Sequence, residues 1–117
     1  MIRTVLAGVA AMVIGGASLV YAQGGGSLTP QDFVEIQQLY AKYNWALDSG
    51  DSKGYADTFT PDGVFNNNVG REAIIKFADG FAKGLGSHVR HWNTNLLITP
   101  SATGASGKVY LVLVDFG

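Results

Sequence analysis

The stretch LDSGDSKGYADTFTPDGVF, residues Leu47–Phe65, ends one helix, builds a second and turns the chain into a strand. Gly50 predicts the end of the first helix, because glycine readily takes the left-handed conformation that follows a last helical turn. Asp51 is a favoured capping residue and predicts a short second helix directly after it. The TPDG turn at 60–63 then leads into a strand that starts at Val64. The segment therefore predicts a compact helix–helix–strand unit.

A longer helix precedes this stretch, and the sequence marks its start as well. Thr29 is a capping residue type, and Pro30 fits the first helical position. Two sets of residues then recur at helical spacing. The first set occupies one arc of the helix: Phe33, Ile36, Leu39, Tyr40, Tyr43 and Leu47. The second forms a separate stripe that ends in a carboxylate: Val34, Ala41, Trp45 and Asp48. A helix with two such stripes is expected to be covered on two sides.

Beyond the turn, a third helix starts at Gly70, and Gly84 and Gly86 end it. Two strands follow at 89–99 and 108–116, and the small residues 100–107 predict a loop between them. Simple alternation divides the first strand into two faces. One face carries Arg90, Trp92, Thr94, Leu96 and Ile98; the other carries His91, Asn93, Asn95 and Leu97.

The last strand is apolar on both faces, so we expect it to be covered on both sides and paired on both edges. Because the sequence ends at Gly117, directly after this strand, we expect one or more C-terminal strands to be missing. The order helix, helix, strand, helix, strand, strand is α+β. We expect three N-terminal helices packed on a curved antiparallel sheet, which together form a cone around a pocket.

Residues 1–22 read as a secretory signal peptide, with a short basic start, an uncharged apolar stretch and small residues before a cleavage site after Ala22. The alternative is an uncleaved membrane anchor. Residues 23–27 form a Gly-rich linker, so the domain proper spans 28–117. After cleavage the protein is expected to be periplasmic or secreted and to have no contact with a membrane.

Composition excludes several kinds of site. The sequence has no cysteine, which excludes disulfides, a thiolate nucleophile and thiolate zinc ligation. The formal net charge is −1 without a basic run, so no nucleic-acid partner is predicted. His88 and His91 fall on opposite faces of a strand, and no metal site is expected there.

Three segments, YAKYNWALDSGDSKGYADTFTPDGVF, GREAIIKF and RHWNTN, together resemble the SnoaL-like branch of the nuclear transport factor 2 (NTF2-like) superfamily. The resemblance implies an α+β cone, often dimeric, with an apolar cavity. Members include polyketide cyclases, dehydratases, ketosteroid isomerases and ligand binders without a known reaction. In the dehydratases a histidine on the RH strand works beside an aspartate near the end of the first helix and a tyrosine before it. These positions match His91, Asp48 and Tyr43.

At two positions the sequence differs from particular members of this family, which argues against their specific mechanisms here. Asn67 stands near the acidic base of ketosteroid isomerases, and an amide cannot take up a proton. Asn66 stands at or near the position of a tyrosine in scytalone-type dehydratases.

On an ideal helix, Tyr43 and Asp48 lie about 140° apart, so both cannot point straight into one narrow pocket.

The chemistry favoured by these residues is proton transfer without a cofactor. An imidazole suits general acid–base chemistry, Asp48 would fix the tautomer of His91, and Tyr43 or Tyr40 would donate to a developing oxyanion. Tyr40, Trp45, Asn93 and Asn95 are expected to line the pocket. The first interpretation is an exported dehydratase, isomerase or cyclase, hence a lyase or isomerase, that acts on a small apolar carbonyl or hydroxyl compound and forms a homodimer.

The second interpretation is a non-catalytic ligand-binding domain of the same fold. His91 would then be a strand histidine satisfied by a neighbour, and Asp48 a helix-end residue with local hydrogen bonds. A third is a dimerisation module that uses the face of Trp92, Leu96 and Ile98.

Overall fold

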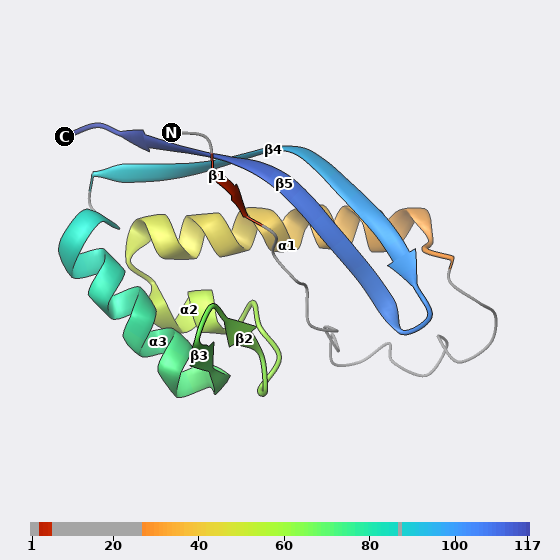
Figure 1. Cartoon of the computed structure of the whole chain (residues 1–117), viewed down its shortest axis with the longest axis horizontal. Helices are drawn as coiled ribbons and strands as arrows, with labels where there is room; N and C mark the ends of the chain where they lie inside the picture. The colour runs from red at the N-terminus through yellow and green to blue at the C-terminus, as the bar shows by residue number, and fades with distance from the viewer. Residues whose placement is uncertain (1–2, 6–26, 87) are drawn as a thin grey trace.

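A computed structural model of the chain describes residues 3–5, 27–86 and 88–117. Figure 1 labels the helices and strands along the chain. They are β1 (Arg3–Val5), α1 (Pro30–Ser49), α2 (Ser52–Ala56), β2 (Val64–Phe65), β3 (Asn68–Val69), α3 (Gly70–Phe81), a π-helical turn (Ala82–Gly86), β4 (Val89–Ser101) and β5 (Gly104–Asp115). Within the described ranges, no helix is both long enough and apolar enough to span a membrane.

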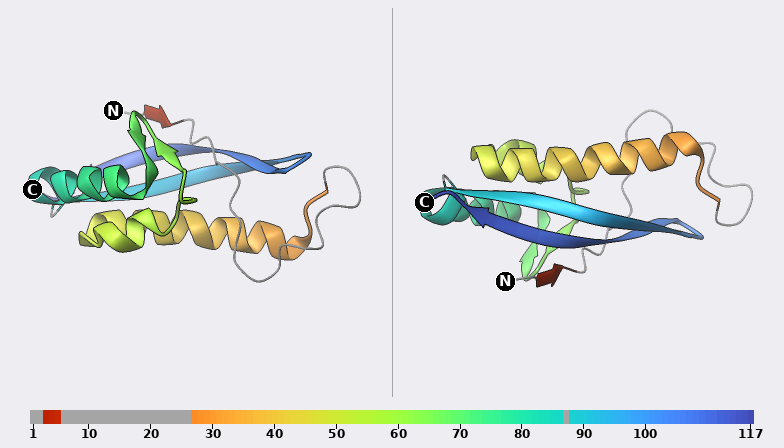
Figure 2. Two further views of the ribbon diagram at one scale, coloured as in Figure 1. Left: turned by 90° about the horizontal axis from the view of Figure 1, so that it is seen from below. Right: turned by 90° about the horizontal axis from the view of Figure 1, so that it is seen from above.

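The two long strands form a twisted antiparallel ribbon that lies along α1 (Figures 1 and 2). α2 packs on α1 and α3, and the small β2–β3 hairpin lies beside α3. Helices thus precede the main strands and cover one side of the sheet, which confirms the predicted α+β architecture. The predicted signal peptide at 1–22 and the predicted linker at 23–27 lie mostly outside the described residues.

The main sheet has the order β1–β5–β4, with both pairs antiparallel. Residues 109–111 of β5 face β1 on one edge, while β4 lies along the other edge of β5. Pairing on both edges of the last strand is therefore confirmed for this segment. Its expected cover on both faces is not supplied by the described residues, because Tyr110 is 50% and Val112 37% exposed.

Local sequence signals explain the bounds of α1. The Thr29 hydroxyl accepts from the Asp32 amide at 3.2 Å, and the Asp32 carboxylate accepts from the Thr29 amide at 2.6 Å, which closes a capping box. At the other end Gly50 is left-handed, with φ 73°, and its amide donates to the carbonyls of Ala46 and Leu47. Both predicted ends of this helix are confirmed.

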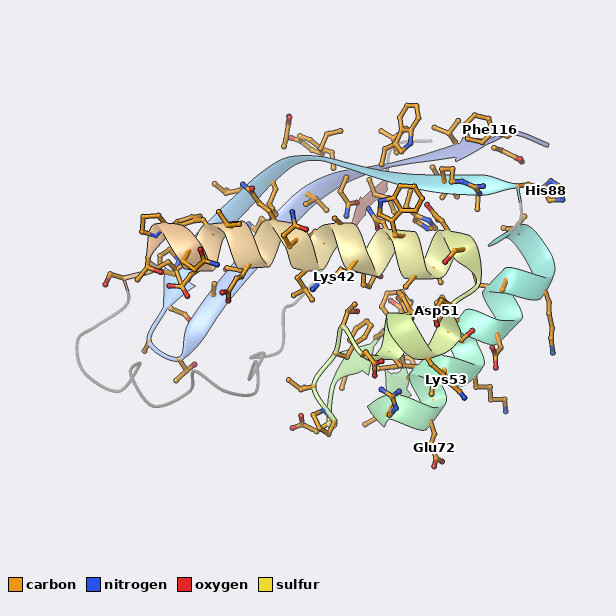
Figure 3. All side chains as sticks on the ribbon, turned by 180° about the vertical axis from the view of Figure 1, so that it is seen from behind. Lys42, Asp51, Lys53, Glu72, His88 and Phe116 are labelled. Atoms are coloured by element: carbon orange, nitrogen blue, oxygen red, sulfur yellow. The ribbon has the colours of Figure 1, made fainter. Side chains whose placement is uncertain are left out.

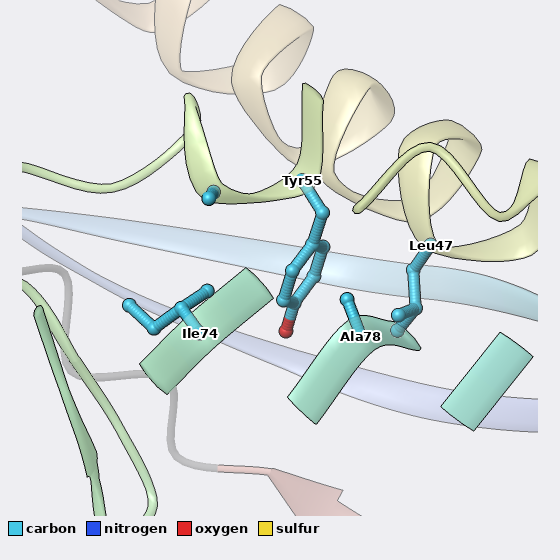
Figure 4. Packing of buried hydrophobic residues seen from close by; sticks show 5 residues of the cluster. Leu47, Tyr55, Ile74 and Ala78 are labelled. Atoms are coloured by element: carbon cyan, nitrogen blue, oxygen red, sulfur yellow. The ribbon is translucent and has the colours of Figure 1, made fainter. Parts of the chain in front are cut away.

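The main hydrophobic core lies among the three helices. Its buried members are Leu47, Tyr55, Ala56, Ile74 and Ala78. Figure 4 shows Tyr55 of α2 between α1 and the α3 side chains Ile74 and Ala78. Tyr43, Phe59, Phe65 and Phe77 surround the Tyr55 ring with centroids 4.7 to 6.4 Å away. This aromatic cluster fixes the short α2 against α1 and thereby holds the end of α1 in place.

The prediction that both stripes of α1 are covered is wrong for most of the second stripe. Val34 is 50% and Trp45 75% exposed, whereas the Asp48 side chain is only 8% exposed. The reason is that α1 packs against α2 and β4, while Val34 and Trp45 lie on a part of the helix that faces solvent.

A β-bulge overturns the predicted alternation in β4. Thr94 pairs with Tyr110 and Leu97 with Lys108, so β4 contains one more residue than β5 between these pairs. Asn95 takes φ 55°, a left-handed conformation that asparagine tolerates. Beyond Asn95 the faces are exchanged: Leu96 is half-buried and Leu97 is 60% exposed.

The loop predicted at 100–107 is also wrong. The ladder continues to the pair Ser101–Gly104, and only residues 102–103 form the turn. Small side chains do not prevent backbone pairing. Pro100, which lacks an amide hydrogen, is tolerated because β4 is an edge strand of this sheet.

Candidate active site

The predicted pair of Asp48 and His91 is in direct contact. Asp48 Oδ1 lies 2.5 Å from His91 Nδ1, and Asp48 Oδ2 accepts from the His91 backbone amide at 2.9 Å. The two side chains are only 8% and 10% exposed. Asp48 is in the last turn of α1 and His91 is near the start of β4, so the pair joins residues 43 positions apart at the point where helix and sheet meet.

The geometry fixes the orientation of the imidazole. Because the carboxylate takes Nδ1, the hydrogen stays on that nitrogen in the neutral ring, and Nε2 is left as the basic nitrogen. Among the described residues nothing hydrogen-bonds Nε2. The Phe81 ring lies 5.4 Å from the His91 ring and provides an apolar wall on one side. This is the arrangement of an oriented general base.

Tyr43 belongs to the aromatic cluster and lies in a different direction from Asp48. The Tyr55 hydroxyl donates to the Tyr43 hydroxyl at 2.8 Å. Burial raises the pKa of Tyr43 to about 12 and also raises the pKa of Tyr55, so both remain protonated at neutral pH. Since Tyr43 accepts this bond, its own proton is left for another acceptor. The described residues show no hydrogen bond between Tyr43 and the Asp48–His91 pair.

Tyr40 lies against the sheet, next to Gly107 of β5. Its hydroxyl is buried without a hydrogen-bond partner among the described residues, and the same holds for Oδ1 of Asn44 one turn later. Burial also raises the pKa of Tyr40. Sequence reasoning missed Asn44, although a signal was present: it lies four residues after Tyr40 and four before Asp48, on the same helix face.

The remaining predicted pocket residues separate into two groups. Asn93 is half-buried on the same face of β4 as His91, whereas Asn95 is exposed at the bulge. Trp45 lines a different space, an open groove of about 980 Å³ between α1 and the α2–β2 connection. The structure therefore brings Asn93 to the side of the pair, and it does not bring Trp45 or Asn95 there.

His88 is exposed at the start of β4, and Figure 3 shows it at the end of the sheet, pointing away from α1. Within the described ranges, no three or more His, Cys, Asp or Glu side chains gather in a group that could hold a metal ion.

Solved structures similar to this chain share its architecture. A protein from Catenulispora acidiphila is 35% identical over 69% of this chain and 63% of its own, with a TM-score of 0.62. A C. acidiphila protein in complex with S-DNPA is 34% identical over 73% and 67%, with a TM-score of 0.64. An NTF2-like protein with a cystatin-like fold from Novosphingobium aromaticivorans is 26% identical over 73% and 60%, with a TM-score of 0.65.

These likenesses place the fold in the NTF2-like, cystatin-like class. The chain belongs to the SnoaL-like domain family, which its residues 30–117 match. It spans less than two thirds of the first of the similar structures. No curated protein matches it significantly.

Proposed function

We propose that this protein is an enzyme that moves protons without a cofactor, as a dehydratase, isomerase or cyclase of a small, largely apolar carbonyl or hydroxyl compound. The observation that carries the proposal is the two-point contact between Asp48 and His91 in a nearly buried position. A carboxylate that fixes one ring nitrogen leaves the other positioned for proton transfer. A similar C. acidiphila protein was solved in complex with S-DNPA, which supports ligand binding by this fold.

For a β-hydroxy ketone the steps are as follows. His91 Nε2 takes a proton from the carbon between the carbonyl and the hydroxyl-bearing carbon, and the electron pair moves onto the carbonyl oxygen. The enolate then re-forms the carbonyl, a carbon–carbon double bond forms, and the hydroxyl leaves with the proton from His91 as water. Asp48 accepts from Nδ1 and stabilises the imidazolium. In an isomerisation the proton returns to another carbon instead.

A hydrogen-bond donor near the carbonyl oxygen would stabilise the enolate. Tyr43 suits this role chemically, because its oxygen already accepts from Tyr55 and its own proton is left for a ligand. Its position in the aromatic cluster makes it an oxyanion donor only for a ligand that reaches between the cluster and the sheet.

The test is turnover of a panel of cyclic β-hydroxy ketones, followed by the absorbance of the conjugated enone. Wild type is expected to turn over at least one of them. His91→Ala is expected to lower the rate by about 10²- to 10⁴-fold, the usual contribution of a positioned acid–base group. Asp48→Asn is expected to lower it as well, and His88→Ala is the matched control. Equal rates in wild type, His91→Ala and Asp48→Asn would exclude the pair; binding without any turnover would favour the non-catalytic alternative.

A second observation favours a homodimer. The outer face of β4 and β5 exposes large apolar side chains: Trp92 is 55%, Leu97 60% and Tyr110 50% exposed. Contiguous apolar patches of this kind are typical of protein interfaces. We propose that two copies associate through this face. Light scattering after gel filtration is expected to give twice the chain mass for wild type and the single mass for Trp92→Lys; a monomeric wild type contradicts the proposal.

We also propose export with cleavage after Ala22, on the pattern of residues 1–22. Cleavage there would remove β1 and free the edge of β5 at residues 109–111. The intact mass of the protein from the periplasm or medium of a producing cell is expected to correspond to a chain that starts at Gln23. A membrane-bound protein of full mass would support the anchor instead.

A further inference from the structure

Three polar side chains line the face of α1 that meets the sheet: Tyr40, Asn44 and Asp48. They follow one another at intervals of four residues, which turns the direction by only about 40° per step. Asp48 is satisfied by His91. The Tyr40 hydroxyl and Asn44 Oδ1 are buried, and neither has a partner in the described part of the chain. A buried polar atom without a partner loses the hydrogen bonds that water gives it in the unfolded chain, so two of them in one row require an explanation.

Two contacts fix where this row lies. At one end Asp48 meets His91 near the start of β4. At the other end the Tyr40 hydroxyl lies so close to Gly107 that a Cβ there would overlap with it, and Gly107 pairs with Ile98. The helix therefore runs antiparallel to β4. Asn44 lies between these two ends, about 6 Å along the helix from Asp48.

We propose that Tyr40 and Asn44 bind a hydroxyl group of the ligand, one helical turn from the reacting end at His91, and so determine specificity. This inference rests on the proposed function, because it takes His91 as the reacting end. A hydroxyl satisfies both protein groups at once: it donates to Asn44 Oδ1 and accepts from the Tyr40 hydroxyl. A carbonyl or an ether oxygen accepts only and would leave Asn44 Oδ1 unpaired.

The spacing also restricts the size of the ligand. The two helix positions lie about 6 Å apart along the axis, so the hydroxyl group and the reacting carbon must belong to one small molecule. The chemical class that fits is a cyclic ketone with a hydroxyl on the far side of the ring. Burial raises the pKa of Tyr40, so its hydroxyl stays protonated and can donate at neutral pH.

The test compares two probes that differ in one hydroxyl, 4-hydroxycyclohexanone and cyclohexanone. Their dissociation constants are measured on the full chain from protein NMR shifts during titration. Wild type is expected to prefer the hydroxylated ketone by about two- to twelvefold, the range of one net hydrogen bond. Tyr40→Phe and Asn44→Leu are each expected to remove this preference and to leave the affinity for cyclohexanone unchanged. Tyr110→Phe, which alters an exposed tyrosine of the outer sheet face, is the matched control.

Both variants delete an unpaired buried atom, so their melting temperatures are expected to stay the same or to rise. Three results would overturn the inference: both variants keep the preference, wild type shows no preference, or neither ketone binds. Each of them would mean that an internal water is the hydrogen-bond partner of Tyr40 and Asn44.

A second readout separates this inference from the proposed function. His91 as a base would exchange the protons next to the ketone carbonyl for deuterium in heavy water. If both ketones exchange these protons for deuterium and bind with equal affinity, the result would support proton transfer and overturn the hydroxyl subsite. A hydroxyl-dependent affinity without exchange would support the subsite and contradict the catalytic role of His91.

Discussion

Asp48 holds His91 by two atoms, the backbone amide at 2.9 Å and Nδ1 of the ring at 2.5 Å. The carboxylate thus fixes the strand backbone and the side chain together. A change at Asp48 is therefore expected to affect the attachment of β4 to α1 as well as the orientation of the imidazole.

Asp48→Asn tests the structural part of this contact. The amide keeps one acceptor oxygen but presents a donor in place of the other, so the charge-assisted bond to Nδ1 is lost and the ring can pair only as the other tautomer. We expect the free energy of unfolding to fall by about 1.5 to 3 kcal/mol, the range for hydrogen bonds to a charged group. Urea denaturation measures it. Asp62→Asn, at an exposed turn position, is the control; equal midpoints for both variants would contradict the prediction.

Asn95 tests the bulge that exchanges the faces of β4. At φ 55° a β-branched residue is strained, so Asn95→Val is expected to lower stability by about 1 to 2 kcal/mol, whereas Asn95→Gly changes it little. Thermal unfolding provides the comparison. Thr94→Val, on the neighbouring extended residue, is expected to be well tolerated. If Asn95→Val is as stable as wild type, the left-handed bulge is not the conformation in solution.

The raised pKa values of Tyr43 and Tyr55 predict that the protein loses stability in alkali. Tyrosine has a pKa near 10 in the unfolded chain, whereas the pKa of Tyr43 is about 12 in the folded state and that of Tyr55 is raised. Between about pH 10 and 12 the unfolded state therefore loses protons that the folded state retains, and stability falls as the pH rises. Below about pH 10 these two residues contribute no pH dependence.

The double variant Tyr43→Phe/Tyr55→Phe isolates this effect. Urea midpoints between about pH 9 and 12 are expected to fall less steeply than in wild type, by up to about 1.4 kcal/mol per pH unit for each tyrosine removed. Near neutral pH the single variant Tyr43→Phe is expected to be less stable than the double one, because it leaves the buried Tyr55 hydroxyl without its partner. A double variant with the wild-type slope would argue against this assignment.

Ile74 tests the core among the helices. Its side chain is fully buried beside Tyr55 and Ala78, so Ile74→Ala is expected to cost about 2 to 5 kcal/mol through lost burial and a cavity. Chemical denaturation measures the loss. Val64→Ala removes apolar atoms at a position that is 49% exposed and is expected to cost much less. Similar losses for the two variants would mean that Ile74 is not a core residue.

Interactions between residues close in the sequence explain why much of the fold was predicted correctly. Thr29 and Gly50 end α1, Asp51 caps α2, and the turn at 60–63 closes with a 2.8 Å bond from the Gly63 amide to the Thr60 carbonyl. Each of these signals acts over a few residues, so it can be read from the chain directly. The α+β class follows from the order of the elements, and the resemblance supplied the pairing of Asp48 with His91, which the structure brings into contact.

Other features depend on contacts between distant segments and were missed or wrong. The bulge at Asn95 arises where β4 is matched to β5, so simple alternation placed Leu96 and Leu97 on the wrong faces. Trp45 was predicted to lie in a second buried stripe, but it is exposed, on a part of α1 that faces solvent. Helical periodicity shows that a face is apolar and does not show what covers it.

The sequence by itself therefore determined where the helices begin and end, because caps and turns are local interactions. The tertiary structure alone decided which polar groups share the interior. It turned Tyr43 towards Tyr55 and Asp48 towards His91, and it left Tyr40 and Asn44 buried beside the sheet without partners. Those relations join residues that are far apart in the sequence, and they depend on how α1 packs against the core around Tyr55 and against β4.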